Sequence, residues 1–348
     1  MLETIGYDED QMAGFAAAAD ATVGRVVRVD RGVATVLTEA GVVRASYGAD
    51  LLCLMATDST AAPCTGDWCV VRDWPDNRVT LDQLLPRRTA VVRATAGEQS
   101  RGQVLCANAD HVAVVASLHP APAVSKIERM VALAWESGAQ PLVVLTKSDL
   151  VPDAHLVAED VAAATPGVEV IVCSTVTGEG VDRIRELVGA NGTIALLGSS
   201  GHGKSSLTNV LVGAEVLVTK EIRDDGRGRH TSVRRELVVL PGGGAVIDTP
   251  GLRGVGLIDA DEGSAATFAD VEALIAHCRF NDCSHRSEPG CAVLAALEDG
   301  SLAQRRYESW QKLQREMAWM ATRKDARLRA ERVKEWKKKV RDAGPTRR

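Results

Sequence analysis

The segment Gly198-Ser199-Ser200-Gly201-His202-Gly203-Lys204-Ser205 matches the phosphate-binding pattern G-x-x-x-x-G-K-[ST]. It follows the apolar run 194–197 and precedes a predicted helix over 204–212, the strand, loop and helix order that the pattern requires. Glycines let successive backbone N–H groups face phosphates, and the helix N-terminus adds its positive dipole end. We therefore expect Lys204 to contact the terminal phosphates and Ser205 to ligate Mg²⁺, with Ser206 in the same nucleotide site.

A second phosphate-sensing element follows this loop in the sequence. Asp248-Thr249-Pro250-Gly251 comes directly after the apolar run 245–247. A carboxylate at that strand end is expected to hold Mg²⁺ through water, with the Gly251 amide near the terminal phosphate. Between the two elements lies Gly226-Arg227-Gly228-Arg229-His230-Thr231-Ser232, whose hydroxyls can complete the magnesium shell. Thr231 is the first candidate for this ligand and Ser232 is the alternative.

Two segments upstream of the phosphate loop have the features of a guanine site. The first segment, which follows the apolar run 141–145, is Thr146-Lys147-Ser148-Asp149. The second, which follows the next predicted strand, is Ser174-Thr175-Val176-Thr177-Gly178-Glu179-Gly180. The Asp149 carboxylate can accept both the ring N–H and the exocyclic amine of guanine, which adenine cannot offer. The usual motif has Asn in place of Thr146, so this chain lacks an amide that braces neighbouring loops. The alternative is a turn and helix cap before Asp153.

The order of these segments predicts a circular permutation. In ordinary GTPases the base-reading segments follow the phosphate loop, whereas here they precede it. Predicted strands 112–116, 141–145, 168–173 and 194–197 alternate with predicted helices 125–137, 154–164, 181–188 and 204–212. This alternation indicates a parallel sheet covered on both faces. The phosphate-sensing segments therefore run directly into the C-terminal region.

The residue that activates water is predicted by elimination. Leu252 follows Gly251, where many GTPases place a Gln that orients the attacking water, and an apolar side chain cannot do so. His230 becomes the candidate, because histidine titrates near neutral pH. A solvent-exposed loop histidine without a catalytic role is the alternative. Lys204, His230 and Thr231 are the predicted catalytic residues, whereas His202 is expected to act through its backbone.

A Cys/His cluster near the C-terminus predicts a structural zinc site. Cys278, Cys283, His285 and Cys291 supply three thiolates and one imidazole, a closed tetrahedral set with no open position for water. His277 competes for the fourth position, but the spacing from Cys283 favours His285. The remaining five cysteines are expected to be small core residues.

Composition sets the broad class of the protein. The chain has 348 residues, 45% of them hydrophobic, and a net charge of −5. Residues 321–348 contain 12 Lys/Arg and 4 Asp/Glu, so this tail carries +8 and the rest of the chain −13. A basic tail on an acidic body is typical of polyanion binding, although a solvated charged helix is the alternative. Without an apolar run of about 18 residues or a basic leader, we expect a cytoplasmic protein with no membrane contact. We also expect it to be a monomer.

Four regions are expected along this α/β chain. Residues 1–20 are predicted to be an acidic, disordered N-terminus. Five short β-rich runs within 21–88 predict a barrel of the OB type, with an SH3-like barrel as the alternative. Residues 89–256 form the circularly permuted P-loop GTPase domain with its parallel sheet. Residues 257–348 form a helical zinc-binding domain that ends in the basic tail.

Together these motifs resemble the ribosome small-subunit-dependent GTPase A (RsgA) family over roughly residues 22–340. The resemblance implies a late-stage assembly factor of the small ribosomal subunit that hydrolyses GTP slowly alone and faster on the subunit. It also implies GTP/GDP with Mg²⁺, one structural Zn²⁺, and OB and zinc domains that bind ribosomal RNA. The family's proposed catalytic histidine corresponds to His230. The chain departs from the family pattern at Thr146, at His202 and in its long basic C-terminal helix.

Two other functions are compatible with the sequence. A nucleotide-stabilised RNA-binding regulator with negligible turnover is consistent with Leu252 and the basic tail. A P-loop ATPase or kinase is the second alternative, and it would not need a carboxylate at Asp149.

Overall fold

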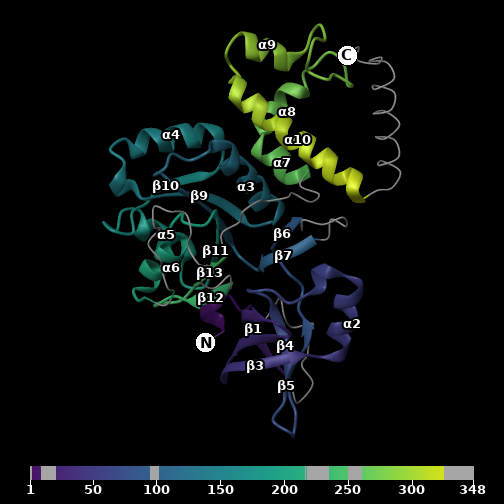
Figure 1. Ribbon diagram of the computed structural model, residues 1–348, viewed down its shortest axis with the longest axis vertical. Helices are drawn as coiled ribbons and strands as arrows, with labels where there is room; N and C mark the ends of the chain where they lie inside the picture. The colour runs from purple at the N-terminus through teal and green to yellow at the C-terminus, as the bar shows by residue number, and fades with distance from the viewer. Residues whose placement is uncertain are drawn as a thin grey trace, which may run out of the picture.

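The computed structural model describes residues 2–8, 21–94, 102–215, 217, 235–249 and 261–324. Three regions follow one another along the long axis in Figure 1: a β-barrel at one end, a sheet flanked by helices in the middle, and a group of helices at the other end. Within the described residues, no helix is both long and apolar enough to cross a membrane. The mixed α/β architecture predicted from the sequence is confirmed.

The N-terminal barrel closes through five strands in the order β1-β2-β3-β5-β4, with β4 pairing back to β1. Its interior is filled by alternating apolar residues such as Val26, Val36, Cys69 and Leu81. A helix between β3 and β4 was not predicted, and it covers one end of the barrel with Leu51. The elements are β1 (Ala21–Asp30), β2 (Val33–Thr38), β3 (Gly41–Tyr47), α2 (Ala49–Thr57), η2 (Ser59–Ala61), β4 (Trp68–Asp73) and β5 (Val79–Leu84).

Residues 2–8 are folded, so for this stretch the expectation of a disordered N-terminus is wrong. A short 3-10 helix, η1 (Glu3–Ile5), buries Leu2 and Ile5 in the largest apolar cluster. The Leu2 N–H donates to Glu39 Oε1 at 2.8 Å, and the Tyr7 ring lies edge-on to Trp68. Apolar burial, a hydrogen bond and a ring contact together hold this segment against the barrel. Residues 9–20 lie outside the described residues.

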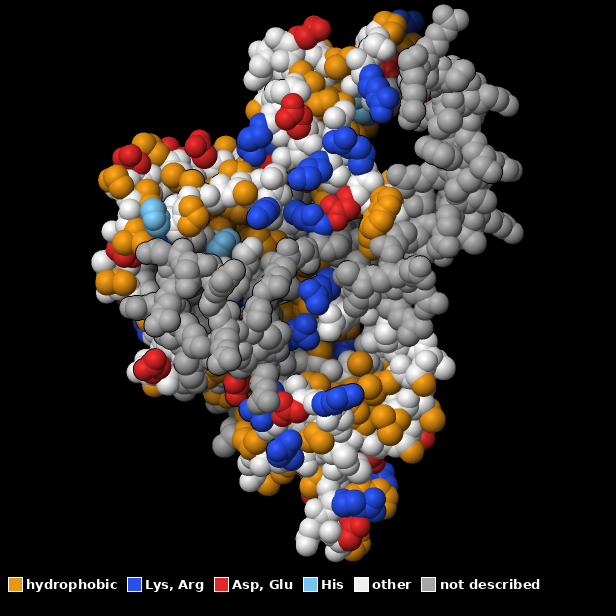
Figure 2. Space-filling model, viewed as in Figure 1, with side chains coloured by type: hydrophobic (Ala, Val, Ile, Leu, Met, Phe, Trp, Pro, Cys, Tyr) orange, Lys and Arg blue, Asp and Glu red, His pale blue; other side chains and the backbone are white. Residues whose placement is uncertain are grey.

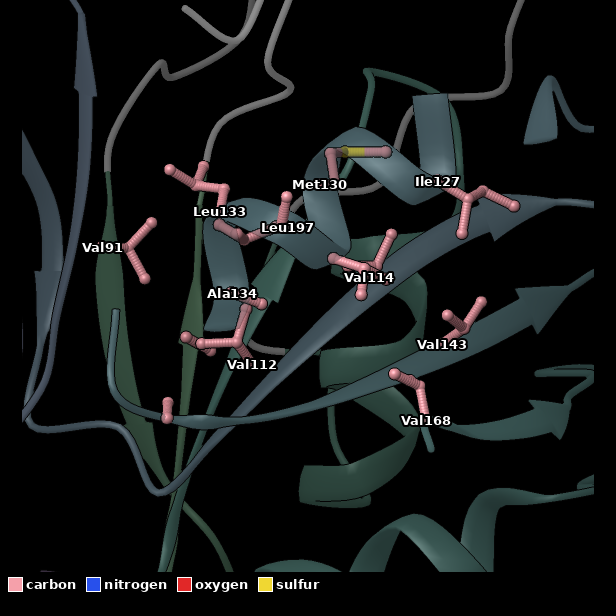
Figure 3. Close-up of a cluster of buried hydrophobic side chains, with 14 of the residues drawn as sticks. Val91, Val112, Val114, Ile127, Met130, Leu133, Ala134, Val143, Val168 and Leu197 are labelled. Carbon is pink, nitrogen blue, oxygen red and sulfur yellow. The ribbon is translucent and has the colours of Figure 1, made fainter. Parts of the chain in front are cut away.

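The central sheet has the order β10-β9-β8-β11-β13-β12, and all neighbouring strands are parallel except β12. Residues of α3 and α4 pack on one face, where Figure 3 shows Ile127 and Met130 of α3 near Val114 and Val143. Residues of α5 and α6 pack on the other face. The strands are β8 (His111–Ser117), β9 (Gln140–Thr146), β10 (Glu169–Val172), β11 (Thr193–Leu197), β12 (Glu236–Val239) and β13 (Ala245–Asp248). The helices are α3 (Val124–Glu136), η3 (Ser148–Leu150), α4 (Ala154–Ala164), α5 (Val181–Val188) and α6 (Lys204–Val212).

The barrel and the central sheet are continuous. Strand β1 pairs with β12 through Arg28 and Glu236, which joins the two into one 11-stranded sheet. The fully buried Arg25 of β1 reinforces the junction, because its guanidinium donates to Thr193 Oγ1 at 2.8 Å and to Asn108 O at 2.9 Å. Burial lowers the pKa of Arg25 to about 10, so the group stays charged at neutral pH. A hairpin of β6 (Ala90–Ala94) and β7 (Gly102–Ala107) follows the barrel.

The C-terminal region consists of helices around the Cys/His cluster. Two short helices begin this region, α7 (Asp261–Thr267) and α8 (Ala269–Ile275), with the buried Phe268 between them. They are followed by α9 (Ala292–Glu298) and α10 (Gln304–Lys324). Helix α7 packs on α3, and α10 also contacts α3. The basic tail beyond residue 324 lies outside the described residues.

Candidate active site

The phosphate loop lies between the end of β11 and the start of α6, as the sequence predicts. Gly198, Gly201 and Gly203 all have positive φ, between 82° and 157°. A Cβ on Gly198 would lie 2.3 Å from Val115 O, so the close approach of the loop to β8 requires glycine. Lys204 Nζ donates to Gly198 O at 2.9 Å and to Ser199 O at 3.0 Å, which holds the ammonium group against the loop.

Asp248 and Ser205 meet beside the loop. Ser205 Oγ donates to Asp248 Oδ2 at 2.8 Å, while Asp248 Oδ1 is buried and has no hydrogen-bond partner among the described residues. Burial raises the pKa of Asp248, and burial also lowers the pKa of Lys204. A buried carboxylate with a spare oxygen next to a hydroxyl fits Mg²⁺, which takes few protein ligands and keeps several waters. These side chains can therefore hold the ion together with nucleotide phosphates.

The two predicted base-reading segments contact each other. Ser174 Oγ donates to Asp149 Oδ1 at 2.5 Å, and Ser148 Oγ donates to Glu179 Oε2 at 2.6 Å. Ser174 Oγ also accepts the backbone N–H groups of residues 176 and 177, which shapes the loop after β10. Lys147 has φ of 65°, an unusual value for a residue with a side chain. The turn at Lys147 presents Asp149 to the loop that contains Ser174.

A hydrogen bond joins these segments to the phosphate loop. Thr146 Oγ1, at the end of β9, donates to His202 O at 2.7 Å. The adjacent strand order β9-β8-β11 explains how residues that precede the loop by about fifty positions reach it. A surface hollow of about 530 Å³ lies between Thr175 and the side of α6, and its lining residues are Thr175, Ser206, Asn209, Val210, Gly213, Ala214 and Glu215. Of these, Thr175 and Ser206 were predicted from the sequence.

Several predicted residues cannot be placed. The segment 226–232, with His230, Thr231 and Ser232, lies outside the described residues, and so do Gly251 and Leu252. Their roles stay predictions. Asp248 and Thr249 are described, and Thr249 Oγ1 donates to Leu196 O at 2.5 Å, which fixes the end of β13 against β11.

The four predicted zinc ligands form one cluster. Their ligand atoms all lie within 4.8 Å of one another. Cys278 Sγ and Cys291 Sγ are 3.9 Å apart, and His285 Nδ1 lies 3.6 and 3.5 Å from them. Tetrahedral zinc with Zn–S bonds of about 2.3 Å separates sulfur ligands by about 3.8 Å, so Cys278, Cys283, His285 and Cys291 fit the metal. The competing His277 is exposed, and its ring contacts Ala273 O.

Comparison with known proteins identifies the family of this chain. The family model described as RsgA GTPase matches residues 84–258, and a protein of Streptomyces coelicolor is 50% identical over 97% of this chain and 92% of its own length. The chain belongs to the RsgA GTPase family. The Streptomyces protein is named "Small ribosomal subunit biogenesis GTPase RsgA", as is one of Opitutus terrae that is 41% identical over 97% of this chain and 95% of its own.

Solved structures support the fold of this RsgA family member. YjeQ from Thermotoga maritima aligns with a TM-score of 0.62 at 23% identity, over 85% of this chain and 98% of its own. YloQ, described as a circularly permuted GTPase, aligns with a TM-score of 0.58 at 24% identity, over 89% and 99%. At these identities the likeness concerns the fold, and it agrees with the circular permutation predicted from the motif order.

The structure of this RsgA family member also reveals supporting residues that the sequence analysis missed. Tyr307 Oη donates to His285 O at 2.7 Å, and the Trp310 ring packs edge-on against the His285 imidazole and stacks on Tyr307. Both aromatic residues lie on α10, three positions apart. That spacing places both rings on one helix face, and it is the sequence feature from which their shared contact with the Cys/His cluster could have been predicted. The sequence analysis included Glu179 in the second base-reading segment but did not predict its hydrogen bond with Ser148.

Proposed function

We propose that the protein is a GTP hydrolase that acts as a late-stage assembly factor of the small ribosomal subunit. The observation that carries this proposal is the Thr146–His202 hydrogen bond, which brings the base-reading segments and the phosphate loop together. The subunit as partner comes from the name of the Streptomyces coelicolor relative, which is 50% identical to this chain. Neither argument alone would lead from nucleotide binding to ribosome assembly.

Guanine nucleotide recognition is assigned to the two segments that this hydrogen bond joins. The Asp149 carboxylate accepts from the base, and Ser174 holds it in place. Thr146, Lys147, Ser148 and Thr175 complete this side. Loop residues Gly198 to Ser205, with Ser206, bind the phosphates through backbone N–H groups, and Lys204 adds its charge. Its present bonds to Gly198 O and Ser199 O must yield when phosphates bind.

Hydrolysis is assigned to transfer of the terminal phosphoryl group to water. Bound Mg²⁺ supplies positive charge that stabilises the charge developing on the phosphates. Ser205 and Thr231 would ligate this ion, and Asp248 would support it through water. Lys204 and the loop amides stabilise the same charge, with the Gly251 amide near the terminal phosphate. His230 positions or activates the attacking water, in place of the Gln that Leu252 replaces.

The remaining regions are assigned to binding of the small ribosomal subunit. Figure 2 shows Lys and Arg side chains along one face, from the C-terminal helices toward the barrel, and such a surface suits ribosomal RNA. One structural Zn²⁺ on Cys278, Cys283, His285 and Cys291 would hold the C-terminal helices together. Residues 323–339 extend the positive charge in sequence. We place the protein in the cytoplasm, as a monomer without membrane contact.

Nucleotide state would control subunit binding. The phosphate-sensing segments lead directly into the zinc region, so GTP can order both and favour the subunit, and hydrolysis then releases the factor. A ligand shifts an equilibrium only through differential affinity, so equal affinity of GTP-bound and GDP-bound protein for the subunit would contradict this coupling.

The test is phosphate release measured with and without purified small ribosomal subunits. We expect stimulation by the subunit that His230→Ala abolishes, while His155→Ala, which changes an exposed histidine on α4, retains it. Nucleotide binding without turnover, even on subunits, would instead identify the RNA-binding regulator. Failure to bind guanine nucleotide would overturn the proposal altogether.

A further inference from the structure

Two residues at which the sequence departs from the family pattern, Thr146 and His202, contact each other. Thr146 is buried, and its hydroxyl donates to His202 O at 2.7 Å, with a second, longer contact of 3.3 Å to Ala116 O. A Cβ on the next loop residue, Gly203, would lie 3.4 Å from the same hydroxyl. The side chain of Thr146 therefore supports the loop where it turns into α6.

The His202 side chain makes a second attachment. Its Nδ1 lies 3.1 Å from Val115 O at the end of β8. A carbonyl oxygen can only accept, so the ring is the donor and carries its proton on Nδ1. Gly198 also approaches Val115 O closely, so β8 supports the beginning of the loop by contact and its later part by this hydrogen bond.

His202 therefore connects the loop to two neighbouring strands. Its carbonyl accepts a hydrogen bond from Thr146 at the end of β9, and its imidazole bonds to Val115 of β8. Both partners of each contact belong to the protein, so no nucleotide atom is needed to make them. A loop that is ordered in advance does not lose conformational entropy when phosphates arrive.

We propose that Thr146 and His202 are positioning residues that hold the phosphate loop in its binding conformation, replacing the asparagine brace that usual GTPases place at position 146. The proposal rests on the proposed function, because it assigns the loop to guanine nucleotides. It reverses the expectation that Thr146 leaves the loops unbraced. It also gives the His202 side chain a task that the sequence analysis assigned to its backbone alone.

Substitutions of matched shape separate this role from simple packing. Thr146→Val keeps the volume and removes the hydroxyl, whereas Thr146→Ser keeps the hydroxyl and removes the methyl group. His202→Leu removes the ring donor, whereas His202→Asn keeps an N–H group near the position of Nδ1. If the hydrogen bonds matter, Ser and Asn retain function and Val and Leu lose it. If packing matters, Val retains it and Ser does not.

The first experiment measures the affinity of the full chain for fluorescent mant-GDP with Mg²⁺. Thr146→Val is expected to weaken binding about 5- to 30-fold, the factor for a lost hydrogen bond that leaves a carbonyl unpaired. Thr146→Ser should stay within about twofold of wild type. His202→Leu should weaken binding by a similar factor as Thr146→Val, and His202→Asn should recover most of it. The preference for guanine over adenine should not change in any variant, because Asp149 is untouched.

The second experiment measures amide hydrogen exchange of the loop peptide without nucleotide. We expect protection of residues 198–205 in wild type and Thr146→Ser, and faster exchange in Thr146→Val and His202→Leu, with unchanged exchange in β11. Equal exchange and equal affinity in wild type and Thr146→Val would overturn the inference. A wild-type protein that bound no mant-GDP would overturn the proposed function instead, and the exchange data would still decide whether these residues order the loop.

Discussion

Arg306 of α10 joins the zinc region to the GTPase region through a buried network. Its Nη1 donates to Glu128 Oε1 of α3 at 3.0 Å and to Ala164 O at 2.7 Å. The other side of the guanidinium donates to both oxygens of Asp270, at 2.7 and 3.0 Å, and to Thr267 O at 2.6 Å. One side chain therefore contacts four helices besides its own: α3, α4, α7 and α8.

Replacement of Arg306 by Met should strongly lower the free energy of unfolding. The side chain of Glu128 is 1% exposed, and its Oε2 already has no hydrogen-bond partner among the described residues, so the carboxylate depends on arginine for charge compensation. Removing one partner of a buried ion pair costs about 3–5 kcal/mol. The neighbouring Arg305 is the matched control, because it is 50% exposed and lies 3.7 Å from the same carboxylate. Arg305→Met should cost less than about 1 kcal/mol.

Urea denaturation followed by tryptophan fluorescence and far-UV circular dichroism measures both effects, and Trp310 reports on α10 itself. We predict a loss of about 3–5 kcal/mol in the free energy of unfolding of this region for Arg306→Met. Adding Glu128→Gln to Arg306→Met should recover part of the loss, because no buried charge then remains unpaired. Equal, small losses for Arg305→Met and Arg306→Met would refute the reasoning.

Three further predictions concern the predicted site residues. Asp149→Asn should abolish tight GTP binding and create binding of xanthosine nucleotides, which calorimetry measures; an unchanged affinity for GTP would contradict the guanine assignment. Cys283→Ser should lower the zinc content from one ion per chain and unfold the C-terminal helices while the central sheet persists, as metal analysis and circular dichroism will report. Wild-type protein purified without zinc would contradict that assignment. Asp248→Asn should stabilise the nucleotide-free protein at neutral pH, because burial raises the pKa of Asp248 and its charged form is disfavoured in the folded state. The gain should shrink as pH falls through the folded pKa and vanish below the usual value of 3.8, and a gain that persisted at low pH would exclude the titration as its cause.

Most of the fold follows from local patterns in the sequence. The bounds 154–164, 181–188 and 204–212 agree with α4, α5 and α6, because apolar residues at helical spacing mark these helices and glycines flank α5 and α6. The pairing of β1 with β12 joins residues about two hundred positions apart, and no local pattern reports such a contact. Helix α2 was missed because its apolar residues do not lie on one face: Leu51 is buried, but Leu52 and Leu54 are exposed.

The candidate site was predictable where chemistry is tied to spacing, as in the phosphate loop and the Cys/His cluster. Residues that act by supporting others were not predictable. The hydroxyl of Thr146 replaces an amide at the same position, but this needs the His202 carbonyl at 2.7 Å, and the distance depends on the strand order. Arg306 lies in a sequence rich in charged and polar residues, 304–316, yet it is buried. Burial of a charged side chain depends on how the helices pack, which the sequence does not display.

The most direct test of the central claim is a crystal structure of the full chain with GDP and Mg²⁺. We predict one nucleotide per chain, with the guanine ring N–H and exocyclic amine within hydrogen-bond distance of the Asp149 carboxylate and the β-phosphate enclosed by residues 198–205. A nucleotide whose phosphates occupy the loop while its base lies away from Asp149 would contradict the account.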